Sequence, residues 1–250
     1  MAPLSPAVTR WGLVAALLGL WELGGRTLVT DPRTALFLPL PSTIALAAAA
    51  LARDGTLLAA IVRSAGRVAA GAGAAVLVGV PVGAVIATWP RLGAALDAPL
   101  RLVRPVPPVA WVPLTLLWFG VGERQQLAIL AFAALLVVVA GTTDAVAGVP
   151  PALLSAARNL GERRLLLRVA VPAALPGVAA AVREGVGTAW FVLVAAEFVS
   201  ASEGLGVLIL EGRDLLEPAR TFVGMGALAA CGAVTDLALA ALQRRWTRWT

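Results

Sequence analysis

The sequence contains no lysine and no histidine, and Cys231 is its only cysteine. Without histidine, the chain cannot build a histidine-ligated metal site or a histidine-dependent catalytic triad. A single cysteine can form neither an internal disulfide nor a cluster of metal-binding thiolates. A Walker A loop needs a lysine that reaches the β- and γ-phosphates of a nucleotide, so this chain cannot carry that loop. These absences argue against an enzyme and predict no bound cofactor or metal.

Charged residues are scarce as well. They make up 14% of the 250 residues, and 60% of the residues are apolar, whereas a typical soluble domain carries about 25% charge. A water-facing surface cannot be built from this composition, and the length suits one compact unit. The basic residues, all arginine, interrupt apolar runs instead of gathering on one face with aromatics, which argues against nucleic-acid binding. We therefore predict an all-α integral membrane protein, with residues 1–250 forming a single transmembrane domain.

The apolar runs predict about six membrane crossings, because about 20 helical residues are needed to cross roughly 30 Å of hydrocarbon. A helix from Ser42 or Thr43 to about Arg53 is too short for that. The third span contains four prolines, which cannot sit in one regular helix, so we expect it to be bent or partly unwound. The predicted spans cover residues 11–29, 61–89, 105–121, 127–147, 173–199 and 219–242.

The arginine-rich connections predict the orientation. Arginines concentrate in residues 91–104, in residues 158–168 and after residue 242, whereas residues 200–218 are acidic. Loops on the cytoplasmic side carry the excess of basic residues. We therefore expect both termini in the cytoplasm and residues 200–218 outside, in a multi-pass protein.

The connection between the fourth and fifth spans, residues 150–172, has a pattern of its own. It is expected to form a short helix, a turn at Gly161 in a positive-φ conformation, and a second short helix that Pro172 stops. Such a helix pair can stand out from the membrane and dock into a groove of another protein. The alternative is an ordinary basic loop that only sets the topology, and residue chemistry alone does not decide between them.

Short motifs along nearly the whole chain resemble those of ABC importer permeases. Ala156, Ala157 and Gly161 match the E-A-A-x-x-x-G coupling motif, with Ser155 in place of the glutamate. The interval from Gly161 to Pro172 is about two residues shorter than the family pattern. Other stretches resemble the nitrate, taurine and aliphatic-sulfonate branch, namely Leu38-Pro39-Leu40-Pro41-Ser42, Arg104-Pro105-Val106-Pro107-Pro108, Trp118-Phe119-Gly120-Val121-Gly122, Ala196-Glu197-Phe198 and Glu203-Gly204-Leu205-Gly206.

The resemblance implies a permease subunit in a bacterial inner membrane, taking up a small solute such as a sulfonate, taurine or nitrate. It implies a second permease subunit, an extracytoplasmic substrate-binding protein and cytoplasmic ATPase subunits that hydrolyse ATP and dock on residues 150–172. The candidate ATPase-coupling residues are Ser155, Ala156, Ala157, Arg158, Gly161, Glu162, Arg163 and Pro172.

The fifth span carries a second group of candidates. Arg183, Trp190 and Glu197 are spaced by seven residues and share one helix face. Charges within a span face a bundle interior or a wet cavity, so this face either lines a translocation path, together with Pro107 and Pro108, or packs helices together. The same charges leave open a rival interpretation, a self-contained secondary transporter that uses them for ion coupling.

Overall fold

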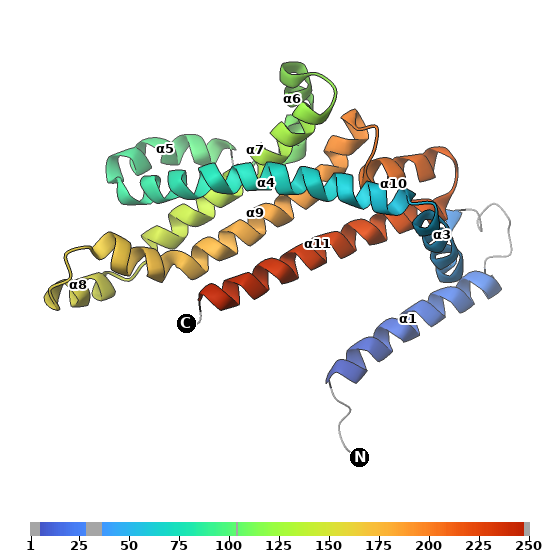
Figure 1. Ribbon diagram of the computed structural model, residues 1–250, viewed down its shortest axis with the longest axis horizontal. Helices are drawn as coiled ribbons and strands as arrows, with labels where there is room; N and C mark the ends of the chain where they lie inside the picture. The colour runs from blue at the N-terminus through green and yellow to red at the C-terminus, as the bar shows by residue number, and fades with distance from the viewer. Residues whose placement is uncertain (1–5, 29–36, 104, 248–250) are drawn as a thin grey trace, which may run out of the picture. The chain divides into compact units, whose positions relative to one another are not determined.

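The computed structural model describes residues 6–28, 37–103 and 105–247, and every regular element within them is helical (Figure 1). The chain divides into two compact units. Unit 1 comprises Met1–Val62 and Glu203–Leu228, and unit 2 comprises Arg63–Ser202 and Ala229–Thr250. Two long helices, α4 (Thr56–Thr88) and α11 (Pro218–Trp246), contribute to both units.

Unit 1 contains α1 (Pro6–Leu28), α3 (Pro41–Arg53), α10 (Leu205–Asp214) and the first turns of α4 and α11. Its core is formed by Leu51, Leu208 and Val223. The helix predicted from Ser42 or Thr43 begins one residue earlier, at Pro41, and no side chain caps it. The Ser42 hydroxyl donates to the carboxylate of Glu22 at 2.9 Å instead, and the Ser42 N–H donates to it at 3.1 Å, so this contact joins α3 to α1.

Unit 2 is built around α7 (Glu123–Ala147) and α9 (Val171–Ser200), which run antiparallel in close contact. Small residues allow this approach: a Cβ atom on Gly141 would lie 2.5 Å from Ala181, and one on Gly185 would lie 2.5 Å from Val138. Helix α4 packs on α7 through further glycines, including Gly83. The second half of α11 packs on α9. In lipid, where no hydrophobic force draws helices together, small residues that admit close packing hold such bundles.

In the part of the chain that the structure describes, four helices are long and apolar enough to cross a membrane: Thr56–Thr88, Glu123–Ala147, Arg168–Ser200 and Pro218–Trp246. They coincide with the second, fourth, fifth and sixth predicted spans. Helix α1 overlaps the first predicted span and has 23 residues, but it is less apolar because it carries Arg10, Glu22 and Arg26.

The third predicted span, residues 105–121, is broken more severely than a bent helix. Helix α5 (Pro90–Val103) precedes a turn, and a 3-10 helix, η1 (Pro108–Trp111), leads into the short α6 (Val112–Phe119). At about 1.5 Å per residue, this segment is too short to cross the hydrocarbon alone. Helix α6 ends at Gly120, and both Gly120 and Gly122 have positive φ, which explains the two glycines of this motif.

The predicted stop at Pro172 is wrong. A helix begins near Leu165, passes through a π-helical turn, η2 (Leu166–Ala170), and continues directly into α9. Pro172 lies in the first turn of α9, where a missing N–H costs little because the wider π turn has already interrupted the regular hydrogen bonds. Helix α8 (Pro151–Asn159) is the only separate helix in residues 150–172.

We predict that Gly83→Ala lowers the free energy of unfolding by about 1–3 kcal/mol. The new Cβ atom would lie 2.7 Å from the backbone oxygen of Val139 and 2.8 Å from the Cβ of Thr142, and neither can move without shifting α7. Gly73→Ala in the same helix is the control, since nothing lies within 4 Å of its added Cβ. Thermal unfolding of the purified chains in detergent measures the difference, and equal stability of the two variants would contradict the packing described here.

Candidate functional site

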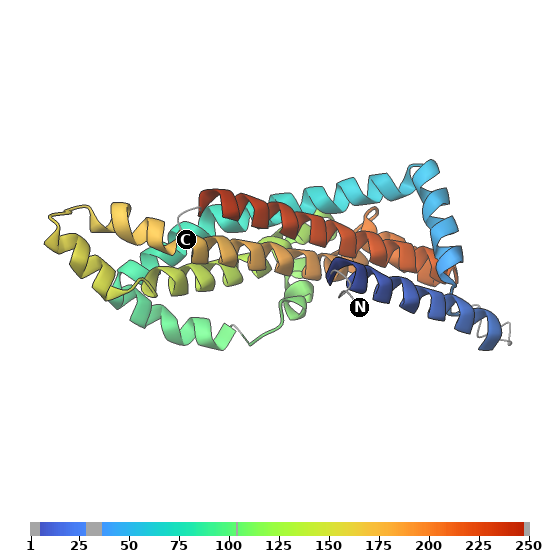
Figure 2. The ribbon, with the colours of Figure 1, turned by 90° about the horizontal axis from the view of Figure 1, so that it is seen from below.

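The segment around α8 stands at one end of unit 2, beyond the ends of α4 and α11 in both ribbon views (Figures 1 and 2). After α8 the chain reverses at Gly161, whose φ of +88° confirms the predicted positive-φ turn. The Gly161 N–H donates to the Arg158 carbonyl at 3.0 Å, and the Glu162 N–H donates to the Ala157 carbonyl at 3.0 Å. These bonds satisfy carbonyl groups that the end of a helix leaves free.

Glu162 stabilises the return of the chain toward α9. Its carboxylate accepts the backbone N–H of Arg164 at 2.7 Å and the guanidinium of Arg168 at 3.1 Å. The pKa of Glu162 is held below its usual range, mainly by the hydrogen bond from the Arg164 N–H and secondly by the one from the Arg168 side chain. The carboxylate therefore stays ionised at neutral pH. The sequence predicted Glu162 as a coupling residue but not this local role.

The rest of the segment is presented outward. Ser155, Ala156 and Arg158 are exposed on α8, and Arg163 is exposed in the turn. Leu160, which the sequence interpretation passed over, is 88% exposed. An apolar side chain at the tip of a projecting turn, surrounded by arginines, is a surface that fits a groove with an apolar floor and an acidic rim.

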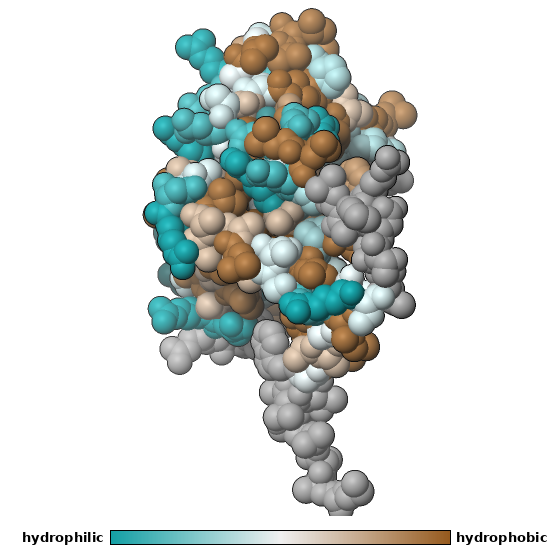
Figure 3. All heavy atoms as spheres, turned by 90° about the vertical axis from the view of Figure 1, so that its right-hand side faces the viewer, coloured by the Kyte–Doolittle hydropathy of each residue, from teal (hydrophilic) through white to brown (hydrophobic). Residues whose placement is uncertain are grey.

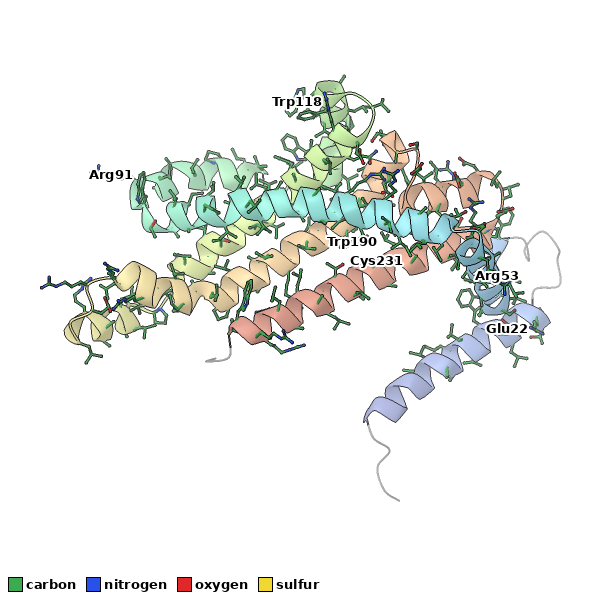
Figure 4. All side chains as sticks on the ribbon, in the orientation of Figure 1. Glu22, Arg53, Arg91, Trp118, Trp190 and Cys231 are labelled. Atoms are coloured by element: carbon green, nitrogen blue, oxygen red, sulfur yellow. The ribbon has the colours of Figure 1, made fainter. Side chains whose placement is uncertain are left out.

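The three residues on one face of α9 each meet a different neighbour within unit 2. Arg183 forms a two-pronged ion pair with Asp236 of α11, with 2.9 Å from Nε to Oδ1 and 2.9 Å from Nη2 to Oδ2. Trp190 is buried between α9 and α11 (Figure 4). Glu197, 1% exposed, accepts the guanidinium of Arg67 in α4 at 2.7 Å.

Glu197 belongs to a larger group of buried polar side chains that sequence reasoning missed. Ser64 donates to its carboxylate at 2.7 Å. One turn further along α9, the Ser200 hydroxyl donates to Gln125 at 2.6 Å and accepts from Gln126 at 3.2 Å. These bonds join α4, α7 and α9. The adjacent pair Gln125-Gln126 at the start of an apolar span could have indicated this polar group from the sequence, because amides in a membrane helix require hydrogen-bond partners.

A cavity of about 440 Å³ lies between α7, α9 and the start of η1. Pro108, one of the candidate path residues, lines it, whereas Pro107 lies in the exposed turn before η1. The polar side chains in its wall are Asp144, Glu184 and Thr188. The structure thus brings Pro108 beside charged residues of the fourth and fifth spans, but it does not bring Arg183, Trp190 or Glu197 into that wall.

Comparisons with known proteins agree on one kind of protein. Residues 79–248 match the family described as "Binding-protein-dependent transport system inner membrane component". The taurine transport system permease protein TauC of Escherichia coli is 34% identical over 99% of this chain and 92% of its own length. The aliphatic sulfonates transport permease protein SsuC of Bacillus subtilis is 31% identical over 95% of this chain and 86% of its own length.

Solved structures share the fold. A chain of the MetNI methionine ABC transporter in an inward-facing conformation superposes with a TM-score of 0.68 and 19% identity, covering 78% of this chain and 98% of that chain. At this identity the similarity establishes the fold alone.

We predict that Glu197→Leu destabilises the protein by about 3–5 kcal/mol, because it leaves the buried Arg67 without this carboxylate. Adding Arg67→Leu should restore much of the loss, since a buried ion pair can often be replaced by apolar residues. A double-mutant cycle compares the free energies of unfolding of wild type, the two single variants and the double variant in detergent. The exposed pair Arg213–Asp214 is the control, where the same replacements should change unfolding little. Strictly additive losses at Arg67 and Glu197 would contradict a direct interaction.

Proposed function

The chain belongs to the family of inner-membrane components of binding-protein-dependent transport systems, and from this membership we propose that it forms half of the membrane pore of an ATP-driven importer of a small solute. As a permease it is a transport subunit and not an enzyme, and a separate subunit hydrolyses ATP. The resemblance identified from short motifs is confirmed.

The projecting segment around α8 is the observation that supports the proposed mechanism. We propose that cytoplasmic ATPase subunits dock on its exposed residues, chiefly Leu160, Ser155, Ala156, Arg158 and Arg163. Ala157, Gly161 and Glu162 maintain the turn that shapes this surface, and Pro172 lies in the first turn of the helix that follows it. Because the chain continues without interruption from η2 into α9, a displacement of the turn would be transmitted along a helix that contacts α4, α7 and α11. This displacement would shift the equilibrium between two conformations of the permease, each with a different side of the membrane accessible.

The remaining parts of the assembly are proposed from the family. A substrate-binding protein delivers the solute outside, and a second permease subunit, identical or different, completes the pore. A multi-pass arrangement with both termini in the bacterial cytoplasm agrees with the arginine distribution. In this orientation the α8 segment faces the cytoplasm and residues 200–218 face outward. The surface seen in Figure 3 mixes hydrophilic and apolar residues, as expected near a membrane boundary.

The substrate is proposed from the relatives. Proteins named for taurine, aliphatic sulfonates and, in Synechocystis, bicarbonate share 34%, 31% and 28% identity with this chain. We propose a sulfonate, taurine, nitrate or a similarly small solute. Its path would pass the cavity beside Pro108, with Pro107 at its edge.

The charged face of α9 is better explained as packing. Arg183 and Glu197 have ion-pair partners on α11 and α4, and Trp190 is buried, so we propose that the three residues maintain the bundle around the path. Charges already paired in this way are poorly suited to coupling by a secondary transporter, and family membership does not favour that alternative.

We predict that Gly161→Arg abolishes co-purification with the ATPase subunit. Any side chain at a φ of +88° strains the turn, and this one also adds bulk and charge to the docking surface. The tagged chain is expressed with its genomic neighbours, extracted in mild detergent, and its partners are identified. The matched control is Gly55→Arg, at a φ of +83° with open space around it, which imposes the same kind of strain in unit 1. Loss of the ATPase from both variants, or from neither, would contradict docking at Gly161.

A transport measurement tests the energy source. In proteoliposomes containing the complete complex, uptake of labelled taurine should require the binding protein on one side and ATP on the other.

Glu162→Gln should reduce ATP-dependent uptake several-fold, because the amide is a weaker acceptor for the Arg164 N–H and forms no ion pair with Arg168. Uptake by this chain alone, without ATP, would contradict the importer assignment. Competition by other sulfonates, nitrate and bicarbonate would then rank the substrates.

A further inference from the structure

The η1–α6 segment contributes one wall of the cavity near Pro108, yet few of its side chains are buried. It is too short to cross the membrane and lies at the end of α7 that is remote from α8 (Figure 1). In η1, which the structure describes in full, no residue is buried, and in α6 only Val112 and Thr115 are. Segments with little buried surface open locally at a low cost in free energy. The position of this wall therefore depends on a few specific contacts.

Helix α7 supplies two contacts that fix this segment. The rings of Trp111 and Phe132 are tilted against each other, with their centroids 5.1 Å apart. The Thr115 hydroxyl accepts an N–H of the Gln125 side chain at 3.0 Å and donates to the Val112 carbonyl at 2.9 Å. Thr115 is 5% exposed and Gln125 is fully buried. Breaking the bond between them would leave a buried amide unpaired, which is costly, so α6 is held at this point.

The same amide group is joined to α9. Ser200, the last residue of α9, donates to the Gln125 side-chain oxygen at 2.6 Å and accepts from the Gln126 amide at 3.2 Å. The donors follow one direction, from Gln126 through Ser200 and Gln125 to Thr115, and bonds arranged in this way strengthen one another. Because hydrogen bonds are directional, this chain of bonds keeps α6, α7 and the end of α9 in one register.

We propose that Gln125 is a positioning residue for transport. Through Thr115 and Ser200 it joins the η1–α6 segment to the end of α9, so that the cavity wall at Pro108 moves when α9 moves. The opposite end of α9 continues from the α8 turn, on which the ATPase is proposed to dock. The inference rests on the proposed importer function, and it explains how a displacement of that turn reaches a cavity wall formed by a different segment.

A transport assay with the complete complex in proteoliposomes tests this role. Thr115→Val replaces the hydroxyl by a methyl group of similar size. Uptake of labelled taurine should fall by roughly five- to thirty-fold, the factor that corresponds to the loss of one buried hydrogen bond, while the rate of ATP hydrolysis stays near that of wild type. Ser200→Ala cuts the chain of bonds on its other side and should give the same result. Solute transported per ATP is the decisive readout, because a weakened fold would lower both rates together.

Two variants serve as controls. Thr115→Ser keeps the hydroxyl and should retain most of the uptake. Thr142→Val makes the same replacement at a fully buried threonine of α7 whose hydroxyl has no hydrogen-bond partner among the described residues, and it should transport like wild type. If Thr115→Val does not fold, Ser200→Ala tests the same chain of bonds from α9.

Spin labels measure the position of α6 directly. In a Cys231→Ser background, the labels are attached at Leu117 of α6 and Phe191 of α9, which are 81% and 73% exposed. The distance between them should be narrowly distributed and equal in the nucleotide-free and ATP-bound complexes, because the chain of bonds makes the two helices move together. Adding Thr115→Val should broaden this distribution.

Three results would overturn the proposal: unchanged transport per ATP in both Thr115→Val and Ser200→Ala, an equal loss in Thr142→Val, or label distances that are equally narrow with and without the Thr115 hydroxyl. Failure of the importer function would look different, since wild type itself would then take up taurine without ATP or fail to retain the ATPase. The label distances decide the positioning role in that case as well.

Discussion

Close contact between α7 and α9 is the interaction on which the rest of unit 2 depends. In a membrane, two helices gain little by hiding apolar side chains from lipid, and their association depends on shape and dispersion. Gly141 and Gly185 allow the backbones to approach so closely that even one added carbon atom would collide. Helix α4 joins this pair through its own glycines, and α11 joins it through Trp190 and the Arg183–Asp236 ion pair.

The close packing also determines where charge can be tolerated. Glu197 and Arg67 are both largely excluded from solvent, and each supplies the other with a partner that lipid could not provide. Ser64 contributes a further hydrogen bond to the same carboxylate. Asp144 and Glu184 instead line an open cavity. The bundle thus separates charges that hold helices together from charges that line the cavity near Pro108.

The α8 segment is connected to this bundle through backbone geometry. Gly161 reverses the chain, Glu162 fastens the return, and the π turn η2 leads into the longest antiparallel contact of the unit. Two prolines, Pro172 and Pro176, lie in the part of α9 next to the turn. The projecting α8 segment thus leads, through the turn at Gly161, directly into a helix that forms the core of unit 2.

Much of this could be predicted from the sequence because it depends on local chemistry. Low charge and long apolar runs were enough to predict an all-α membrane protein. Four of the predicted spans coincide with apolar helices. Gly161 adopts the predicted conformation because only glycine accepts that φ readily. The seven-residue spacing placed Arg183, Trp190 and Glu197 on one face, but it could not identify their neighbours. Glu197 meets Arg67, 130 residues away in the chain, and Arg183 meets Asp236, 53 residues away. Such pairings, like the passage of the helix through Pro172, were decided only by the tertiary structure, because they depend on which helices pack together and not on the residues next to each charge or proline.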